Sequence, residues 1–368
     1  MEQFYQGSLD VFLTKVRADF DTVEDQAEKA ISALEVNGLL KTENMPNALF
    51  TEVSNIDSDG DRAVWRNISV TGIKQLGTRK AGGNFPEASF IRGYETAVYD
   101  PDTQDASEIV VPEERQDKEG KMYKSVLNRA TKLIIEGRRK NIGDPFDVFN
   151  LAFTAPTSYP VHFNAKGNLG LDGNMTALGE RLISIAHARA DGGTTISNAV
   201  QNSGNAAPFN ITYYEAALEQ GQTFKDDVGK PMPMFGGSIT VVVPPANGLV
   251  ATAKEIVDSE WKPETANNEI NAFKGTFNNI ISSPYLSASY NVSTITDTRK
   301  WFLVDTSTQD PEVGTGLVRV CFVPTNSRVG RDQRTQAVMF QYKQSYNYVW
   351  TDFRNVLGSK GDNAAYSS

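Results

Sequence analysis

The hydrophobic residues between Pro112 and Asn141 recur every three or four positions, which is the spacing of one face of a helix. The residues on this face are Met122, Val126, Leu127, Ala130, Leu133, Ile134 and Gly137. Acidic residues occupy the first turn and basic residues the last, which matches the helix dipole. We therefore expect a helix roughly 40 Å long, unless Gly120 interrupts it and leaves a helix from about Lys121.

A second periodic stretch, residues 8–36, has apolar residues that alternate spacings of four and three over nearly four heptads. These residues are Leu9, Leu13, Val16, Phe20, Val23, Ala27, Ala30 and Leu34. The pattern predicts a helix, and two interpretations remain open for its apolar side. It packs either on its own domain or on a neighbouring subunit or partner helix.

The stretch from Arg62 to Val111 changes to the pattern of strands. Two strand-like runs flank a glycine-rich basic segment that lacks the apolar residues needed for a core. The simplest arrangement is a two-stranded arm, and an isolated ribbon of this kind is marginal in water. Four aromatic residues would be partly exposed unless another surface covers them: Trp65, Phe85, Phe90 and Tyr94. A hairpin lying on its own domain is the alternative.

The rest of the chain mixes helices and strands without regular alternation. The spacing predicts helices at 144–153, 174–188, 212–220 and 248–260, a buried strand at 238–245, and a strand-rich C-terminal third. This order is typical of an α+β fold rather than of a doubly wound sheet.

Composition and charge narrow the class of protein. The 368 residues are 39% hydrophobic and 22% charged, a globular composition, and no apolar run is long enough to predict a membrane span. Residues 1–60 hold twelve acidic and four basic residues, a balance of −8 out of a net −9. No basic block resembles a nucleic-acid footprint, which argues against tight duplex binding. The single Cys321 excludes an internal disulfide.

Residues with catalytic or metal-binding chemistry form no recognisable constellation. His162 and His187 have no metal-binding spacing, and Cys321 lies in a predicted strand as a buried structural thiol. The pair Asp226-Asp227 reads as a solvated turn, and the acidic turn at 57–61 lacks the pattern of a calcium loop. We therefore expect no enzyme activity, no cofactor and no metal.

Several segments, in order, resemble the major capsid proteins of tailed bacteriophages, closest to the Mu-like major head subunit family. They are LISIAHARADGGTTISN (182–198), DDVGKPM (226–232), SITVVVPPANGLVATAKEIVDSE (238–260), GTFNNIISSPYL (275–286), KWFLVD (300–305) and YVWTDFRNVLGSKG (348–361). The resemblance spans about residues 112–361, and the acidic first sixty residues match no such pattern.

The resemblance implies the Hong Kong 97 fold, whose parts we expect to follow one another in sequence order. The expected parts are an acidic N-terminal arm (1–61) with helix 8–36, an extended hairpin loop (62–111), a peripheral domain with the spine helix (112–164), an axial domain (165–325) and C-terminal strands returning to the peripheral domain (326–368). Trp65, Phe85, Phe90, Tyr94, Leu13 and Phe20 are the residues that we expect at subunit interfaces.

The resemblance also implies partners and a location. The chain would self-assemble as pentamers and hexamers into an icosahedral virion head that encloses double-stranded DNA, with weak non-specific DNA contact and no membrane. Scaffold, portal and decoration proteins are further expected partners, and assembly would take place in the host cytoplasm. Two alternatives remain: an encapsulin-like nanocompartment shell, which shares the fold, and a soluble ligand-binding module.

Overall fold

The computed structural model describes Ala18, Lys29 and most of the chain from residue 48 onward. The described ranges are 48–54, 56–59, 62–75, 89–99, 105–111, 121–154, 181–189, 192–226, 228–246, 248–263, 269–289, 292, 295–308, 316–331, 334–335 and 337–366. The chain divides into two compact units. The first unit comprises residues 1–43, 102–142 and 322–346, and the second comprises 44–101, 143–321 and 347–368.

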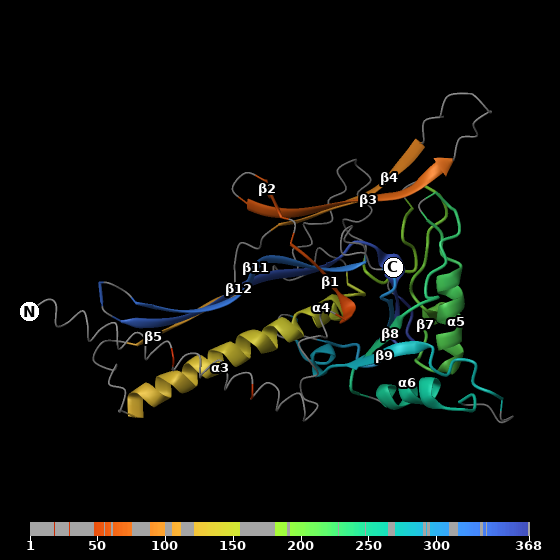
Figure 1. Ribbon diagram of the computed structural model, residues 1–368. Coiled ribbons are helices and arrows are strands. Elements are labelled where there is room, and N and C mark those ends of the chain that lie inside the picture. Colours follow the sequence, from red (N-terminus) through yellow and green to blue (C-terminus); the bar gives the residue numbers. More distant parts are fainter. Residues whose placement is uncertain are drawn as a thin grey trace, which may run out of the picture. The chain divides into compact units, whose positions relative to one another are not determined.

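The described elements mix helices with strands, which confirms the predicted α+β class (Figure 1). The helices are α3 (Lys121–Gly143), α4 (Pro145–Asn150), α5 (Ile211–Gln222) and α6 (Leu249–Asp258), with short 3-10 helices η5 (Pro284–Leu286) and η6 (Phe353–Asn355). The strands are β1 (Thr51–Val53), β2 (Asp57–Asp59), β3 (Arg62–Gln75), β4 (Ser89–Tyr99), β5 (Asp105–Val111), β6 (Gln201–Asn202), β7 (Asn205–Ala206), β8 (Ile239–Val243), β9 (Phe277–Ser282), β10 (Trp301–Asp305), β11 (Leu317–Arg331), β12 (Val338–Trp350) and β13 (Val356–Ser359).

In the first unit, α3 packs on a sheet. β5 pairs antiparallel with β12, and β11 is the other neighbour of β12. Side chains of β12 alternate, so Val338, Phe340 and Tyr342 are buried while the intervening residues face outward. Ala130 and Ile134 are buried on α3, as its apolar period predicts. Gly137 lets the helix approach the Tyr342 ring, and Gln344 Nε2 donates to the Gly137 carbonyl at 3.5 Å.

The second unit is built on a four-stranded sheet with the order β13-β10-β8-β9. β8 runs parallel to β9, and β10 runs antiparallel to both β8 and β13. All five residues of β8 and all five of β10 are buried, which confirms the predicted buried strand at 238–245. Helix α5 begins at the N-cap Asn210, whose side chain accepts from Tyr213 N at 3.0 Å.

The predicted antiparallel strand pair is present as β3 and β4, and β2 adds a third strand. Register shifts interrupt the pairing of β3 with β4 between Ile68 and Gln75. Trp65 is only 5% exposed, because the subunit's own chain covers it, and at this residue the structure agrees with the alternative of a hairpin that lies on its own domain. Sequence reasoning also missed β5, whose residues pair with β12, far along the chain.

One of the predicted helices differs from the structure. Residues 181–188 of the helix predicted at 174–188 are not helical, while 174–180 lie outside the described residues. His187 instead exchanges backbone hydrogen bonds with Ile196, at 2.7 and 2.9 Å. This pairing, together with the contacts of the Asn198 side chain, overrides a helical spacing of apolar residues. The long helix is described from Lys121 and runs to Gly143, and residues 112–120 lie outside the described part.

Gly137→Ala should weaken the packing of α3 on its sheet. An added Cβ would overlap the Tyr342 ring, so we expect a loss of roughly 1–3 kcal/mol that the better helix propensity of alanine only partly offsets. Urea unfolding of the unassembled subunit measures this change. Gly236→Ala is the control, because a Cβ there meets nothing within 4 Å. Equal stability of Gly137→Ala and wild type would contradict the packing described here.

Candidate assembly surfaces

The core of the second unit is organised around the side chain of Asn198, which is fully buried. Its Oδ1 accepts from Ser184 N at 2.9 Å and lies 3.0 Å from His187 Nε2. Its Nδ2 donates to three backbone carbonyls at 2.8–3.1 Å, those of Leu182, Phe353 and Val356. One amide therefore ties two of the segments that carry the family resemblance, 182–198 and 348–361, to each other.

Arg354 connects this core to Lys225, the residue directly before the resembling segment 226–232. The His187 ring stacks on Phe353, with centroids 3.7 Å apart and the planes 9° from parallel. The next residue, Arg354, is buried and donates from Nε to the Lys225 carbonyl at 3.0 Å. Its Nη1 is 3.1 Å from Asp352 Oδ1, so the buried guanidinium is paired.

Lys225, whose carbonyl accepts from Arg354, directly precedes Asp226-Asp227, where the sequence predicts a solvated turn. Asp226 Oδ1 accepts from Val228 N at 3.0 Å and from Lys230 N at 2.7 Å, which confirms the turn at Asp226. Asp227 lies outside the described residues. Gly229 has a φ of +85°, a conformation that favours glycine at this position.

A second buried polar tie holds α4. Lys300 Nζ donates to Asn150 Oδ1 at 2.7 Å, and Asn150 Nδ2 donates to Asp147 Oδ1 and to the Tyr285 carbonyl, both at 2.9 Å. Burial lowers the pKa of Lys300 to about 8, although the negative charges of Asp297 and Asp147 oppose this shift. The cluster fixes α4 to η5 and to the start of β10.

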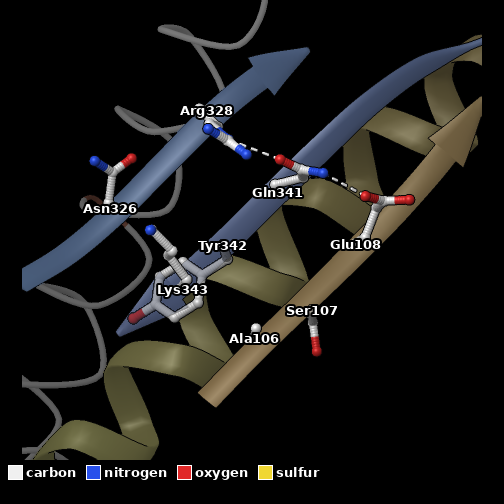
Figure 2. A pocket seen from close by; sticks show the side chains of 8 residues that line it. All are labelled: Ala106, Ser107, Glu108, Asn326, Arg328, Gln341, Tyr342 and Lys343. Atoms are coloured by element: carbon white, nitrogen blue, oxygen red, sulfur yellow. Dashed lines mark hydrogen bonds between the residues drawn. The ribbon is translucent and has the colours of Figure 1, made fainter. Parts of the chain in front are cut away.

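The outward face of the first unit's sheet carries a polar row across three strands (Figure 2). Arg328 Nε on β11 donates to Gln341 Oε1 on β12 at 2.7 Å, and Gln341 Nε2 donates to Glu108 on β5. The row borders an open groove of about 310 Å³ lined by Ala106, Ser107, Glu108, Asn326, Arg328, Gln341, Tyr342 and Lys343. Solvent screens these exposed charges, so the row contributes little to the stability of the subunit.

The interface residues expected from the sequence are not brought together by the described structure. Leu13, Phe20 and Phe85 lie outside the described residues. Phe90 and Tyr94 lie on β4, but only their backbone is described. With Trp65 buried, the interface role of all these residues stays a prediction.

The residues considered for chemistry are buried or undescribed. His187 and Cys321 are buried, the latter within β11 as predicted, and His162 lies outside the described residues. Within the described residues, no group of three or more His, Cys, Asp or Glu side chains could hold a metal ion. In the same part of the chain, no helix has the length and apolar character to cross a membrane.

Sequence reasoning missed the polar residues that hold the second unit together. Lys300 and Asn150 are 150 positions apart, and Asn198 bonds a residue 158 positions away. An asparagine in a polar stretch gives no local sign that its amide will be buried. Only the resemblance, which includes Asn198 and Arg354 in its segments, pointed to these positions.

Asn198→Asp should unfold or strongly destabilise the subunit. The substitution removes the donor to three carbonyls and buries a carboxylate among them, so we expect a loss of about 3–5 kcal/mol. Thermal and urea unfolding measure it. Gln201→Glu makes the same amide-to-acid change at an exposed site and should stay within about 0.5 kcal/mol of wild type. A mild effect at Asn198 would show that this amide is dispensable.

The buried Lys300 should make stability rise with pH. Its folded-state pKa, about 8, lies below the ordinary 10.5, so the unfolded chain binds more protons between these values. We expect the free energy of unfolding to gain up to about 2 kcal/mol from this group between about pH 7.5 and 9.5.

The measurement is urea unfolding at several pH values below 10, because the raised pKa values of Tyr214 and Tyr366, both about 12, lower stability above that point. Lys300→Met should flatten the rise, whereas Lys274→Met, at an exposed lysine, should keep it. If the free energy of unfolding rose with pH equally in wild type and Lys300→Met, Lys300 would not be the cause of the rise.

No protein-family model and no curated protein matches this sequence. Among solved structures, the capsid of cyanophage A-1(L) matches with a TM-score of 0.47 and 12% identity, covering 90% of this chain and 95% of that chain. The mature capsid of bacteriophage PhiM1 matches with a TM-score of 0.45 and 11% identity, covering 87% of each chain. An encapsulin complex from Synechococcus elongatus matches with a TM-score of 0.39 and 11% identity, covering 89% and 90%.

Proposed function

We propose that this chain is a structural shell subunit, the major capsid protein of a tailed bacteriophage, that self-assembles as pentamers and hexamers into an icosahedral head enclosing double-stranded DNA. The observation that carries the proposal is where the resembling segments lie. Residues 182–198 and 348–361, which are separate in sequence, meet in one buried polar core around Asn198, and the segment 226–232 lies beside 182–198, where Gly229 packs against the Arg189 side chain. The resemblance therefore extends to residues that determine the fold, rather than to scattered surface positions.

The order of the elements supports the same function. A long antiparallel strand pair is followed by a long helix and then by a mixed domain, the order that the resemblance implies. β3 and β4 are 14 and 11 residues long, well above the usual strand length of about 5–6 residues. Long paired strands outside a large sheet gain stability when another surface covers them, and a neighbouring subunit would supply that surface.

The proposed mechanism is binding rather than catalysis. β4 is the last strand of its sheet, in the order β2-β3-β4, so among the described strands its outer edge has no partner. An open edge pairs readily with another chain, and a shell exploits this property between identical subunits. Val110, 50% exposed at the outer face of β5, is an apolar position of the kind that such contacts cover.

The finer parts of the proposal rest on the sequence resemblance. They are the boundaries 1–61, 62–111, 112–164, 165–325 and 326–368, the interface residues on the arm and the N-terminal helix, and the partners. Scaffold, portal and decoration proteins would act in the host cytoplasm, and the mature subunit would reside in the virion. Contact with the enclosed DNA would be weak and independent of base sequence.

Purified recombinant subunits should form closed shells of uniform size. Sedimentation and negative-stain images measure this directly, and the contents of the shells separate a phage head from a nanocompartment, which holds a protein cargo. Phe20→Asp, on the apolar seam of helix 8–36, should reduce the assembled fraction several-fold if that helix packs on a neighbour.

Ala18→Asp is the matched control, because Ala18 is helical, exposed and off the seam. It should assemble like wild type. A stable monomer that forms no particles under any condition would contradict the shell function and favour a soluble ligand-binding module. Full assembly of Phe20→Asp would contradict only the role of the helix.

A further inference from the structure

The outer face of α3 is basic in a chain that is acidic overall. Residues 128–143 contain five basic residues and one acidic residue, a net charge of +4, whereas the whole chain carries −9. The basic residues are Arg129, Lys132, Arg138, Arg139 and Lys140, and the acidic one is Glu136. The local sign is therefore opposite to that of the chain.

The helical period collects most of these charges on one side. The line of Ala130, Ile134 and Gly137 faces the sheet, since the first two are buried and the third lies against Tyr342. With about 3.6 residues per turn, Arg129 and Lys132 point away from that line. Both are exposed. Arg139 and Lys140 continue the same face about two to three turns later and are half-buried.

The single acid on this face does not neutralise it. Glu136 Oε2 lies 3.6 Å from Arg139 Nη1. This pair is exposed, and solvent screens it. We name the face formed by Arg129, Lys132, Glu136, Arg139 and Lys140 the basic helix face.

The opposite side of the first unit has a different character. Figure 2 shows α3 behind the sheet, with Arg328, Gln341 and Glu108 on the sheet's other side. There Glu108 and Arg328 are joined through Gln341, so their charges largely cancel, and Lys343 is the remaining exposed cation described on that groove. Among the described residues, the two sides of the unit thus differ in charge.

We propose that the basic helix face binds the phosphate backbone of the enclosed nucleic acid and hence faces the inside of the shell. From Arg129 to Lys140 the face extends roughly 16 Å along the helix, which spans about five base-pair steps of a duplex. Arginine offers a fork of donors to phosphate oxygens, and Lys132 offers a point charge.

Two to four such contacts give weak, salt-sensitive binding without base recognition, as a packaged genome requires. This inference rests on the shell function proposed above, because only a closed shell has an inside. It adds which surface of the subunit the nucleic acid touches.

The first test is binding of a fluorescent 20-bp duplex by full-length subunits, followed by anisotropy at about 50 and 200 mM salt. Arg129→Gln with Lys132→Gln should weaken binding roughly tenfold and flatten the salt slope by about 2. The matched control removes two cations from the sheet side, Arg328→Gln with Lys343→Gln, and should bind like wild type. Glu136→Gln, which removes the one acid of the basic helix face, should bind more tightly.

The second test is the nucleic acid that shells retain after external nuclease treatment. Shells of the helix-face double variant should hold several-fold less than wild-type shells, and sheet-side shells should hold the wild-type amount. The inference is wrong if wild-type subunits bind no duplex at about 50 mM salt, if both double variants lose binding equally, or if the helix-face shells retain a full content. If neither wild type nor the double variants form shells, the result counts against the shell function instead. The anisotropy measurement then still decides which face binds the duplex.

Discussion

The second unit depends on hydrogen bonds made by one buried carboxamide. Asn198 Nδ2 lies within hydrogen-bond distance of three backbone carbonyls, and its Oδ1 accepts from one backbone N–H. In a low-dielectric interior, each of these groups would be costly if it were left unpaired. The amide therefore fixes the path of 182–187 against the segment that leads into β13. Val200 N, two residues on, donates to the Gly358 carbonyl at 2.9 Å and continues this alignment into the sheet.

This alignment matters because the packing of the sheet leaves no space for β13 to shift relative to β10. Gly358 packs against the ring of Phe302 on β10, and a Cβ there would overlap that ring. Phe302 also contacts Phe149 and Phe153, with centroids 5.1 and 5.7 Å away, so the sheet, α4 and the following turn share one aromatic cluster. The Lys300–Asn150 tie then fixes the same helix from its polar side. Buried polar groups of this kind specify one arrangement more than they add stability.

The sequence predicts elements well where the reason for them is local. Four of the five residues of β8 and four of the five of β10 are apolar, a composition typical of a buried strand, and both strands are present. The apolar period of α3 likewise predicts Ala130 and Ile134 as buried. The α+β class and the strand pair before the long helix follow from such local patterns, and the structure contains them.

Prediction from local sequence fails where residues far away in the chain determine the conformation or burial of a segment. Residues 182–188 have helical spacing, but His187 pairs with Ile196 and stacks on Phe353, contacts that no window of local sequence contains. The sequence leaves open whether Trp65 on its ribbon is exposed or covered, and the structure shows that its own subunit covers it. β5 has ordinary strand composition, and nothing in it indicates β12 as its partner. The polar core has the same difficulty, because the partners of Asn198 are supplied by the fold.

The charge of α3 shows how a correct local pattern can still hide a surface. Counted along the chain, the basic residues between 128 and 143 are spread among apolar ones and form no block, so no nucleic-acid footprint is visible in the sequence. Folded into a helix, the same spacing that buries Ala130 and Ile134 must place Arg129 and Lys132 on the other side. The helical period of an amphipathic helix thus determines both its buried apolar side and its exposed polar side. The apolar side holds the helix on its sheet, and the charge of the other side follows from the residues left over. In a chain whose net charge is −9, a cationic outer side is a feature that overall composition conceals and that only the helix geometry shows.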